Sequence, residues 1–96
     1  MNDPLLRVPL PHHRIASRLI RGRAVILDPS TEELQRLNEV GSLVWQRITE
    51  RKHTVEALIA ATVDSFEVDH STATNDVLAF LAQLEEKGLL RYAETG

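Results

Sequence analysis

The sequence lacks cysteine altogether, and aromatic residues make up only 4% of its 96 residues. The absence of cysteine excludes disulfide bonds, thiolate catalysis and cysteine-ligated zinc or iron–sulfur clusters. No window holds the roughly 18 uninterrupted apolar residues that a membrane span needs, and the N-terminus lacks a basic segment followed by an apolar signal core. We therefore expect a cytoplasmic protein that performs no redox chemistry of its own.

The composition that remains is that of one small globular domain. Hydrophobic residues make up 43% of the chain and charged residues 26%, as in ordinary packed proteins. The net charge is −3, but residues 1–27 carry five arginines against one aspartate, a net +4, which leaves −7 for the remainder. This asymmetry suggests a basic face for an acidic peptide or nucleic acid, and a solvated arginine-rich hairpin explains it equally well.

The first third of the chain predicts a lead-in followed by strands. Three prolines within residues 1–13 resist helix formation, so we expect a flexible lead-in that is poorly ordered before about Pro11. Alternation over residues 14–20, a turn at Gly22 and a β-branched run over residues 24–27 predict a hairpin. Residues 33–37 alternate weakly and are polar, which suits the edge strand of a three-stranded antiparallel sheet.

The remainder of the chain predicts three helices. One covers roughly residues 39–49 with Asn38 as its N-cap, and a second begins after the cap residue Thr54. The third follows a loop over residues 67–71 and ends at Gly88. The predicted fold is therefore α+β and winged-helix-like, a single domain over residues 14–92 with a short tail over 93–96.

No constellation of residues predicts catalysis, a metal site or a cofactor. All four histidines lie in predicted loops, and none is paired with another ligand at helical spacing. The sequence also lacks a nucleophile elbow and a glycine-rich phosphate loop. The histidines are His12, His13, His53 and His70. We expect a protein that is not an enzyme, and we expect Trp45 to lie in the core.

A winged-helix DNA-binding or regulatory protein is the main alternative function, and a toxin–antitoxin-like or assembly subunit is another. A recognition helix needs lysine and arginine to approach a polyanion. The second predicted helix has neither, and the third offers only Lys87 at its far end. Only the arginine-rich hairpin supports DNA binding, which would then be weak and non-specific.

Several motifs in order resemble the PqqD-like family, the peptide-binding modules called RiPP recognition elements. They are an L-N-x-x-G element at Leu37, Asn38 and Gly41, a T-V-x-x-L opening at Thr54, and a D-V-x-x-F-L-x-x-L-x-x-x-G-L-L ending that starts at Asp76. The resemblance spans residues 15–90 and is nearest to the general L-N-x-x-G branch. The pathway stays open between quinone-cofactor, lasso-peptide and other peptide-tailoring systems.

The resemblance implies a non-catalytic chaperone for the leader of a ribosomally synthesised precursor peptide. Such modules bind the leader as an added strand beside the third helix and present it to a modifying enzyme, such as a radical SAM enzyme, a cyclase or a leader peptidase. The residues expected to bind the peptide are Glu33, Leu34, Gln35, Arg36 and Leu37 on the edge strand, and Asp76, Phe80, Gln83 and Lys87 on the third helix. The opposite helical flank, with Leu78 and Glu85, is the alternative wall. We expect no contact with membranes.

Overall fold

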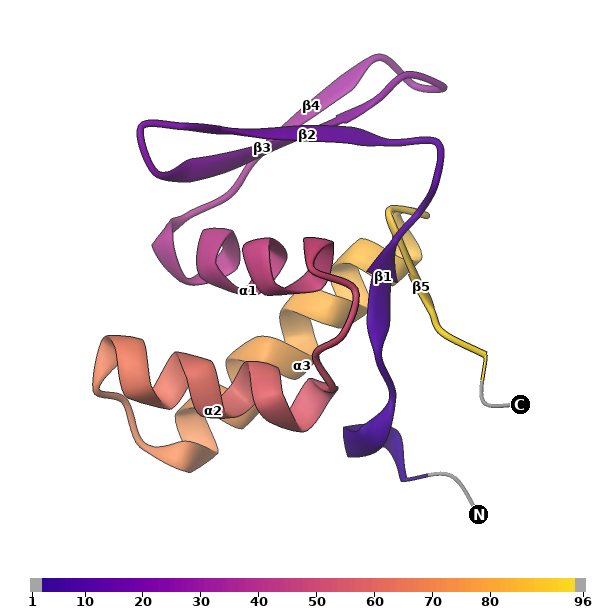
Figure 1. The fold of residues 1–96 in the computed structure, drawn as a ribbon. Helices are drawn as coiled ribbons and strands as arrows, with labels where there is room; N and C mark the ends of the chain where they lie inside the picture. The colour runs from indigo at the N-terminus through magenta and orange to yellow at the C-terminus, as the bar shows by residue number, and fades with distance from the viewer. Residues whose placement is uncertain (1–2, 95–96) are drawn as a thin grey trace.

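The computed structural model describes residues 3–94. Figure 1 shows a three-stranded sheet lying over α1, with α2 and α3 on the other side of that helix and a short two-stranded ribbon at one end. The elements are η1 (Pro4–Leu6), β1 (Pro9–Pro11), β2 (Ala16–Ile20), β3 (Arg23–Asp28), β4 (Glu33–Arg36), α1 (Glu39–Thr49), α2 (Val55–Phe66), α3 (His70–Glu86) and β5 (Leu90–Tyr92). This arrangement confirms the predicted α+β class, with three antiparallel strands followed by three helices.

The sheet has the order β2-β3-β4, so β2 and β4 are both edge strands. Val25 of β3 lies opposite Arg18 on one side and Arg36 on the other. Ala24 and Ile26 are buried against the helices, whereas Val25 and Leu27 lie on the outer face, as the two-residue period of a strand requires. The predicted hairpin and edge strand are confirmed.

Each helix begins at a side chain that caps its first turn. Asn38, Thr54 and Asp69 each accept a hydrogen bond from a backbone N–H three residues later. The first two caps and helices were predicted correctly. The loop predicted over residues 67–71 was too long, because Asp69 acts as a cap and α3 begins at His70.

The N-terminal segment differs from the prediction of a poorly ordered lead-in. Pro9 and Pro11 are buried in β1, which pairs with β5. The N–H of His12 donates to the carbonyl of Leu89, and that of Ala93 donates to the carbonyl of Val8. By alternation, the positions of Pro9 and Pro11 face away from β5, so their missing N–H groups cost no hydrogen bond.

The domain boundaries predicted at residues 14 and 92 remain a prediction. Regular elements already begin before residue 14, with η1 at Pro4 and β1 at Pro9. Residues 1–2 and 95–96, which belong to the predicted lead-in and tail, lie outside the described residues.

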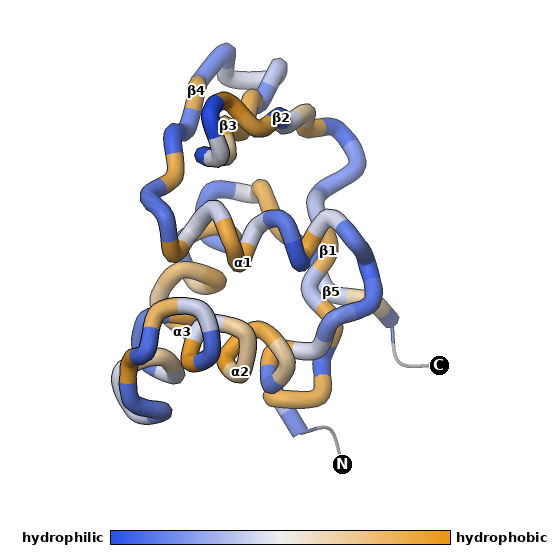
Figure 2. Tube along the Cα trace, turned by 60° about the vertical axis from the view of Figure 1, so that its left-hand side comes forward, coloured by the Kyte–Doolittle hydropathy of each residue, from blue (hydrophilic) through white to orange (hydrophobic). Residues whose placement is uncertain are grey.

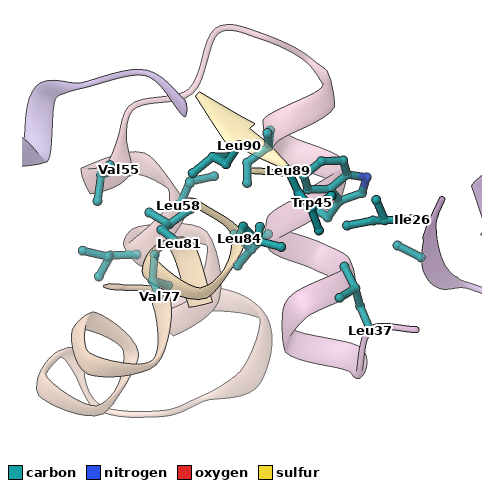
Figure 3. Packing of buried hydrophobic residues seen from close by; sticks show 14 of the residues in the cluster. Ile26, Leu37, Trp45, Val55, Leu58, Val77, Leu81, Leu84, Leu89 and Leu90 are labelled. Carbon is teal, nitrogen blue, oxygen red and sulfur yellow. The ribbon is translucent and has the colours of Figure 1, made fainter. Parts of the chain in front are cut away.

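The core lies between the three helices and the inner face of the sheet (Figure 3). Trp45 is 2% exposed, which confirms its predicted place in the core, and Leu58, Leu81 and Leu84 belong to the same buried cluster from α2 and α3. Figure 2 shows hydrophilic residues gathered in the turns of the sheet and in the loop after α1. The hydroxyl of Ser42 on α1 accepts a hydrogen bond from the N–H of Ala24 at 2.8 Å, which fixes the sheet over the helix.

Candidate functional site

The backbone of β4 presents unpaired groups along the edge of the sheet. The N–H of Leu37 donates to the carbonyl of Ala24 at 3.0 Å, so this residue points toward β3. Because the partners of an antiparallel strand alternate, Gln35 and Glu33 also point toward β3, and Leu34 and Arg36 direct their N–H and C=O groups outward. Within residues 3–94 these outward groups form no hydrogen bonds. The edge of β4 can therefore accept another strand.

The side chains of the predicted edge segment divide between the two faces of the sheet. Glu33 and Gln35 face the side on which α3 lies, and Leu37 is 7% exposed and belongs to the core. Leu34 is 65% exposed on the outer face, and Arg36 lies on that same face. Only part of the predicted segment can therefore contribute side chains to a site beside α3.

A hydrogen bond joins β4 to the end of α3. Lys87 Nζ donates to Gln35 Oε1 at 2.9 Å, although the two residues are 52 positions apart. A cavity of about 160 Å³ lies beside this contact. Its lining includes Ile26, Asp28, Thr31, Glu33, Gln35 and Lys87.

A second, larger cavity of about 320 Å³ lies farther along α3, toward the start of α1. It is lined from α3 by Asp76, Phe80 and Gln83, and from the α1 side by Asn38, Gly41 and Val44. Val44 and the ring of Phe80 give this cavity an apolar part, and Asp76 and Gln83 add polar groups. We call the β4 edge together with these two cavities the β4–α3 groove.

The structure brings together six of the nine predicted residues as groove-lining side chains. They are Glu33, Gln35, Asp76, Phe80, Gln83 and Lys87. Leu78, which is 42% exposed, and Glu85 line neither cavity. The flank of α3 chosen from the sequence thus lines the cavity beside α1, and Lys87 just after it contacts β4.

The L-N-x-x-G element shapes one end of the groove. Leu37 anchors in the core, and Asn38 Oδ1 accepts the N–H of Gly41 at 2.8 Å. A Cβ on Gly41 would lie 3.1 Å from Asn38 Oδ1 and 3.3 Å from Phe80 Cε1. The glycine therefore allows the helix cap and the Phe80 ring to occupy adjacent space.

Asp28 is a buried charge at the other end of the groove. Its carboxylate accepts hydrogen bonds from Arg14 Nη2 at 3.0 Å and Nε at 3.3 Å, and from the hydroxyl and N–H of Ser30. The hydrogen bonds from Arg14, and then those from Ser30, hold the pKa of Asp28 well below its usual range. This carboxylate therefore stays ionised and paired, and it fastens the chain entering β2 to the turn that leads to β4.

Sequence reasoning missed some of the residues that line the groove. Asn38 and Gly41 were interpreted only as a helix start, and Val44 only as core. Asp28 and Thr31 were interpreted as a turn. The strand register would have placed Asp28 opposite Glu33, but nothing in the sequence indicated that α1 approaches Phe80.

The histidines do not gather with other possible ligands. Within residues 3–94 no group of three or more His, Cys, Asp or Glu residues could hold a metal ion. His70 is the first residue of α3 and not part of a loop, contrary to prediction. His53 is hydrogen-bonded to Glu50, and His12 stacks on His13.

Residues 23–90 match the family model described as coenzyme PQQ synthesis protein D (PqqD). The chain belongs to the PqqD family. None of the curated proteins matches it in sequence. Of the helices that residues 3–94 form, none is long and apolar enough to cross a membrane.

Two solved structures of similar fold extend this assignment. TbiB1 in complex with the TbiA(beta) leader peptide is 29% identical, with a TM-score of 0.79 over 88% of this chain and 99% of that one. A lasso peptide synthetase B1 complexed with the leader peptide is 23% identical, with a TM-score of 0.78 over 88% of this chain and 98% of that one. The second likeness shows the fold alone, and the first adds sequence similarity across nearly the whole domain.

Proposed function

We propose that this PqqD-family protein binds the leader of a ribosomally made precursor peptide as an additional strand on β4. The observation that carries the proposal is an open strand edge that faces a groove on α3. Strand addition supplies affinity through backbone hydrogen bonds, and pockets for alternate side chains supply selectivity. The 29% identical neighbour bound to a leader peptide supports this function.

The expected strength of binding explains why both parts of the groove are needed. Leu34 and Arg36 offer four outward backbone groups, and each hydrogen bond contributes about 1 kcal/mol net. Micromolar affinity requires about 8 kcal/mol, so the backbone alone supplies roughly half. Burial of one large apolar leader side chain against Phe80 and Val44 would add about 2 to 3 kcal/mol.

In this role the protein performs no chemistry itself and presents the leader to a modifying enzyme. A radical SAM enzyme, a cyclase and a leader peptidase are the candidate partners. Glu33 to Leu37 form the edge segment, with Leu34 and Arg36 supplying the hydrogen bonds. Asp76, Phe80, Gln83 and Lys87 form the helical wall. Asp76 and Gln83 would hydrogen-bond the leader and fix its register.

The test uses proline to remove an outward N–H from one edge at a time. Arg36→Pro removes a donor that faces away from β3, and its ring obstructs an approaching strand, so the sheet should survive while capture is lost. Leu19→Pro makes the matched change on β2, because the backbone N–H of Leu19 also points away from β3. We expect Arg36→Pro to weaken binding of a fluorescent leader peptide, synthesised from a precursor identified among the genes that neighbour this one, at least tenfold in anisotropy titrations.

Leu19→Pro should leave leader affinity within about twofold of the unmodified protein, and circular dichroism should show both variants folded. Leader binding that persists in a folded Arg36→Pro variant would show that strand addition on β4 is not the mode of binding.

A further inference from the structure

The sheet has a second open edge, on β2. The N–H and carbonyl of Ala24 point away from β2, toward Ser42 and Leu37. The alternation of the β2–β3 ladder therefore leaves the backbone groups of Ser17 and Leu19 on the free edge. Within residues 3–94 these groups form no hydrogen bonds, and every residue of β2 is exposed.

A hollow of about 400 Å³ runs beside this edge, between β2 and α1. We call it the β2–α1 groove. Its lining includes Ser17, Leu19, Trp45, Gln46, Thr49 and Glu50. Leu19 contributes an apolar side chain that is 51% exposed.

The floor of the β2–α1 groove contains a hydrogen-bond donor without an acceptor. Trp45 is 2% exposed, and its Nε1 is buried with no partner among the described residues. Figure 3 shows the indole nitrogen on the side of the ring toward Ile26 and the sheet. Buried indole N–H groups are normally hydrogen-bonded, because leaving one unpaired costs free energy. Because this nitrogen is fully covered, the groove presents the ring of Trp45, and not its N–H, to a bound segment.

The charge beside this edge defines what it can accept. Arg18 lies on β2 and Arg21 in the turn after it, whereas Arg23 donates to the carbonyl of Leu37 on the β4 side of the sheet. Glu50 is the acidic residue of the groove lining. By the register, the side chain of Arg18 projects to the outer face of the sheet, opposite to Leu19, and Arg18 also lines the rim of the groove. A strand added to β2 would place alternate side chains beside Arg18 and the others in the groove. The geometry suits an extended segment with acidic residues on one face and apolar residues on the other.

We infer that β2 and the β2–α1 groove form a second strand-addition site, which takes an extended acidic segment of the peptide-modifying enzyme. The inference rests on the proposed function, because it supplies the contact by which a leader-bound protein reaches its enzyme. The two guests would then lie on opposite edges of one sheet, with β3 between them. A second copy of this chain fits the site less well, since pairing two β2 strands would bring their arginines together.

The experiment uses two probes: a peptide-modifying enzyme identified among the genes that neighbour this one, and a short synthetic peptide in which valine alternates with glutamate. Trp45 is the sole tryptophan, so its fluorescence reports directly on the β2–α1 groove. We expect both probes to change Trp45 emission in a saturable way. A peptide in which valine alternates with lysine should bind at least tenfold more weakly.

Variants separate the two edges. Leu19→Pro should weaken both probes at least tenfold and leave leader affinity unchanged, and Arg36→Pro should do the reverse. Arg18→Glu tests the charge without altering the backbone and should also weaken both probes about tenfold. Arg91→Glu is its matched control, an exposed arginine on β5 that should have no effect.

Each other outcome overturns the inference in a recognisable way. Probe binding lost in Arg36→Pro but kept in Leu19→Pro would place the segment on β4, and equal binding of the lysine peptide would exclude an acidic guest. A dimer dissociated by Leu19→Pro would identify a second copy as the occupant. Tight duplex DNA binding at physiological salt, lost in Arg18→Glu, would identify a nucleic-acid surface. If the leader fails to bind the unmodified protein, the proposed function fails, whatever happens at β2.

Discussion

The two edges of the sheet offer similar backbone and different surroundings. β4 and β2 each direct the amides and carbonyls of two residues outward. A hollow lies between β4 and the end of α3, and another lies between β2 and α1. Beside β4 lies α3, joined to the strand by the Lys87–Gln35 hydrogen bond. Beside β2 lies α1, and the strand carries arginine with no acidic residue.

An open edge allows a peptide strand to pair with the sheet, and the side chains of the adjacent helix determine which peptide binds. Phe80, with Asp76 and Gln83, gives the β4 side an apolar pocket and polar groups that can fix a register. The β2 side offers the apolar side chain of Leu19 and the ring of Trp45, with the positive charge of Arg18 beside them. Selectivity for the leader should therefore be lost by changing residues around the Phe80 cavity and not by changing residues of the β2–α1 groove.

Phe80→Ala should produce the largest loss of leader affinity among side-chain changes that leave the backbone intact. Removing the ring takes away about 2 kcal/mol of apolar contact, which corresponds to roughly thirtyfold weaker binding. Gln46→Ala, in the β2–α1 groove, is the matched change and should have no effect on the leader. Calorimetric titration of each variant checks the comparison, and equal losses would show that α3 does not select the leader.

Asp28→Asn should destabilise the sheet at neutral pH and loosen both edges together, because the Asp28–Arg14 pair fastens the entry to β2 and the turn before β4. The pKa of Asp28 is lowered on folding, so its contribution is complete above the unfolded value and is lost as the pH falls below about 4. The difference in urea midpoint between this variant and the unmodified protein should therefore narrow between pH 7 and pH 3.

Asp64→Asn, an exposed carboxylate on α2, serves as the control for the pH series and should show no such narrowing. If the difference in urea midpoint between Asp28→Asn and the unmodified protein were the same at pH 3 as at pH 7, the hydrogen bonds from Arg14 and Ser30 would not stabilise the Asp28 carboxylate.

Gly41→Ala should weaken leader binding several-fold with little change in stability. The new methyl group gains about 1 kcal/mol of helix propensity but crowds the Asn38 cap and pushes the Phe80 ring into the groove. Gly22→Ala, in the β2–β3 turn where φ is +81°, should cost about 1 kcal/mol of stability without affecting the leader. Paired denaturation and binding curves test the contrast. Unchanged leader affinity in Gly41→Ala would mean that the ring does not meet the peptide.

Lys87→Met should have the smallest effect, below about threefold on leader affinity. Its hydrogen bond with Gln35 is exposed, and such contacts contribute little net free energy. Anisotropy titration checks this value. A tenfold or larger loss would indicate that Lys87 contacts an acidic group of the leader directly.

The sequence predicted the elements well where local chemistry determines them. Helices capped by Asn38 and Thr54 begin where side-chain chemistry places them, and the β-branched run over residues 24–27 correctly predicted a strand. Spacing along α3 placed Asp76, Phe80 and Gln83 on one flank, and these residues line one cavity. These features depend on residues near one another in the chain.

Features that depend on distant contacts could not be predicted. The prolines of β1 disfavour regular structure locally, and only β5, some 80 positions later, makes their missing N–H groups harmless. The sequence predicted a turn at Asp28, but the ion pair of Asp28 with Arg14 forms only in the folded protein. The groove itself required the approach of α1 to Phe80, which no local pattern encodes.

Hydrogen exchange of the edge amides is the most direct test of strand addition. With saturating leader peptide, the amides of Leu34 and Arg36 should become protected while those of Ser17 and Leu19 keep their free rate. Protection of Ser17 and Leu19 instead, or no added protection on β4 despite tight binding, would contradict the proposal that the leader pairs with β4.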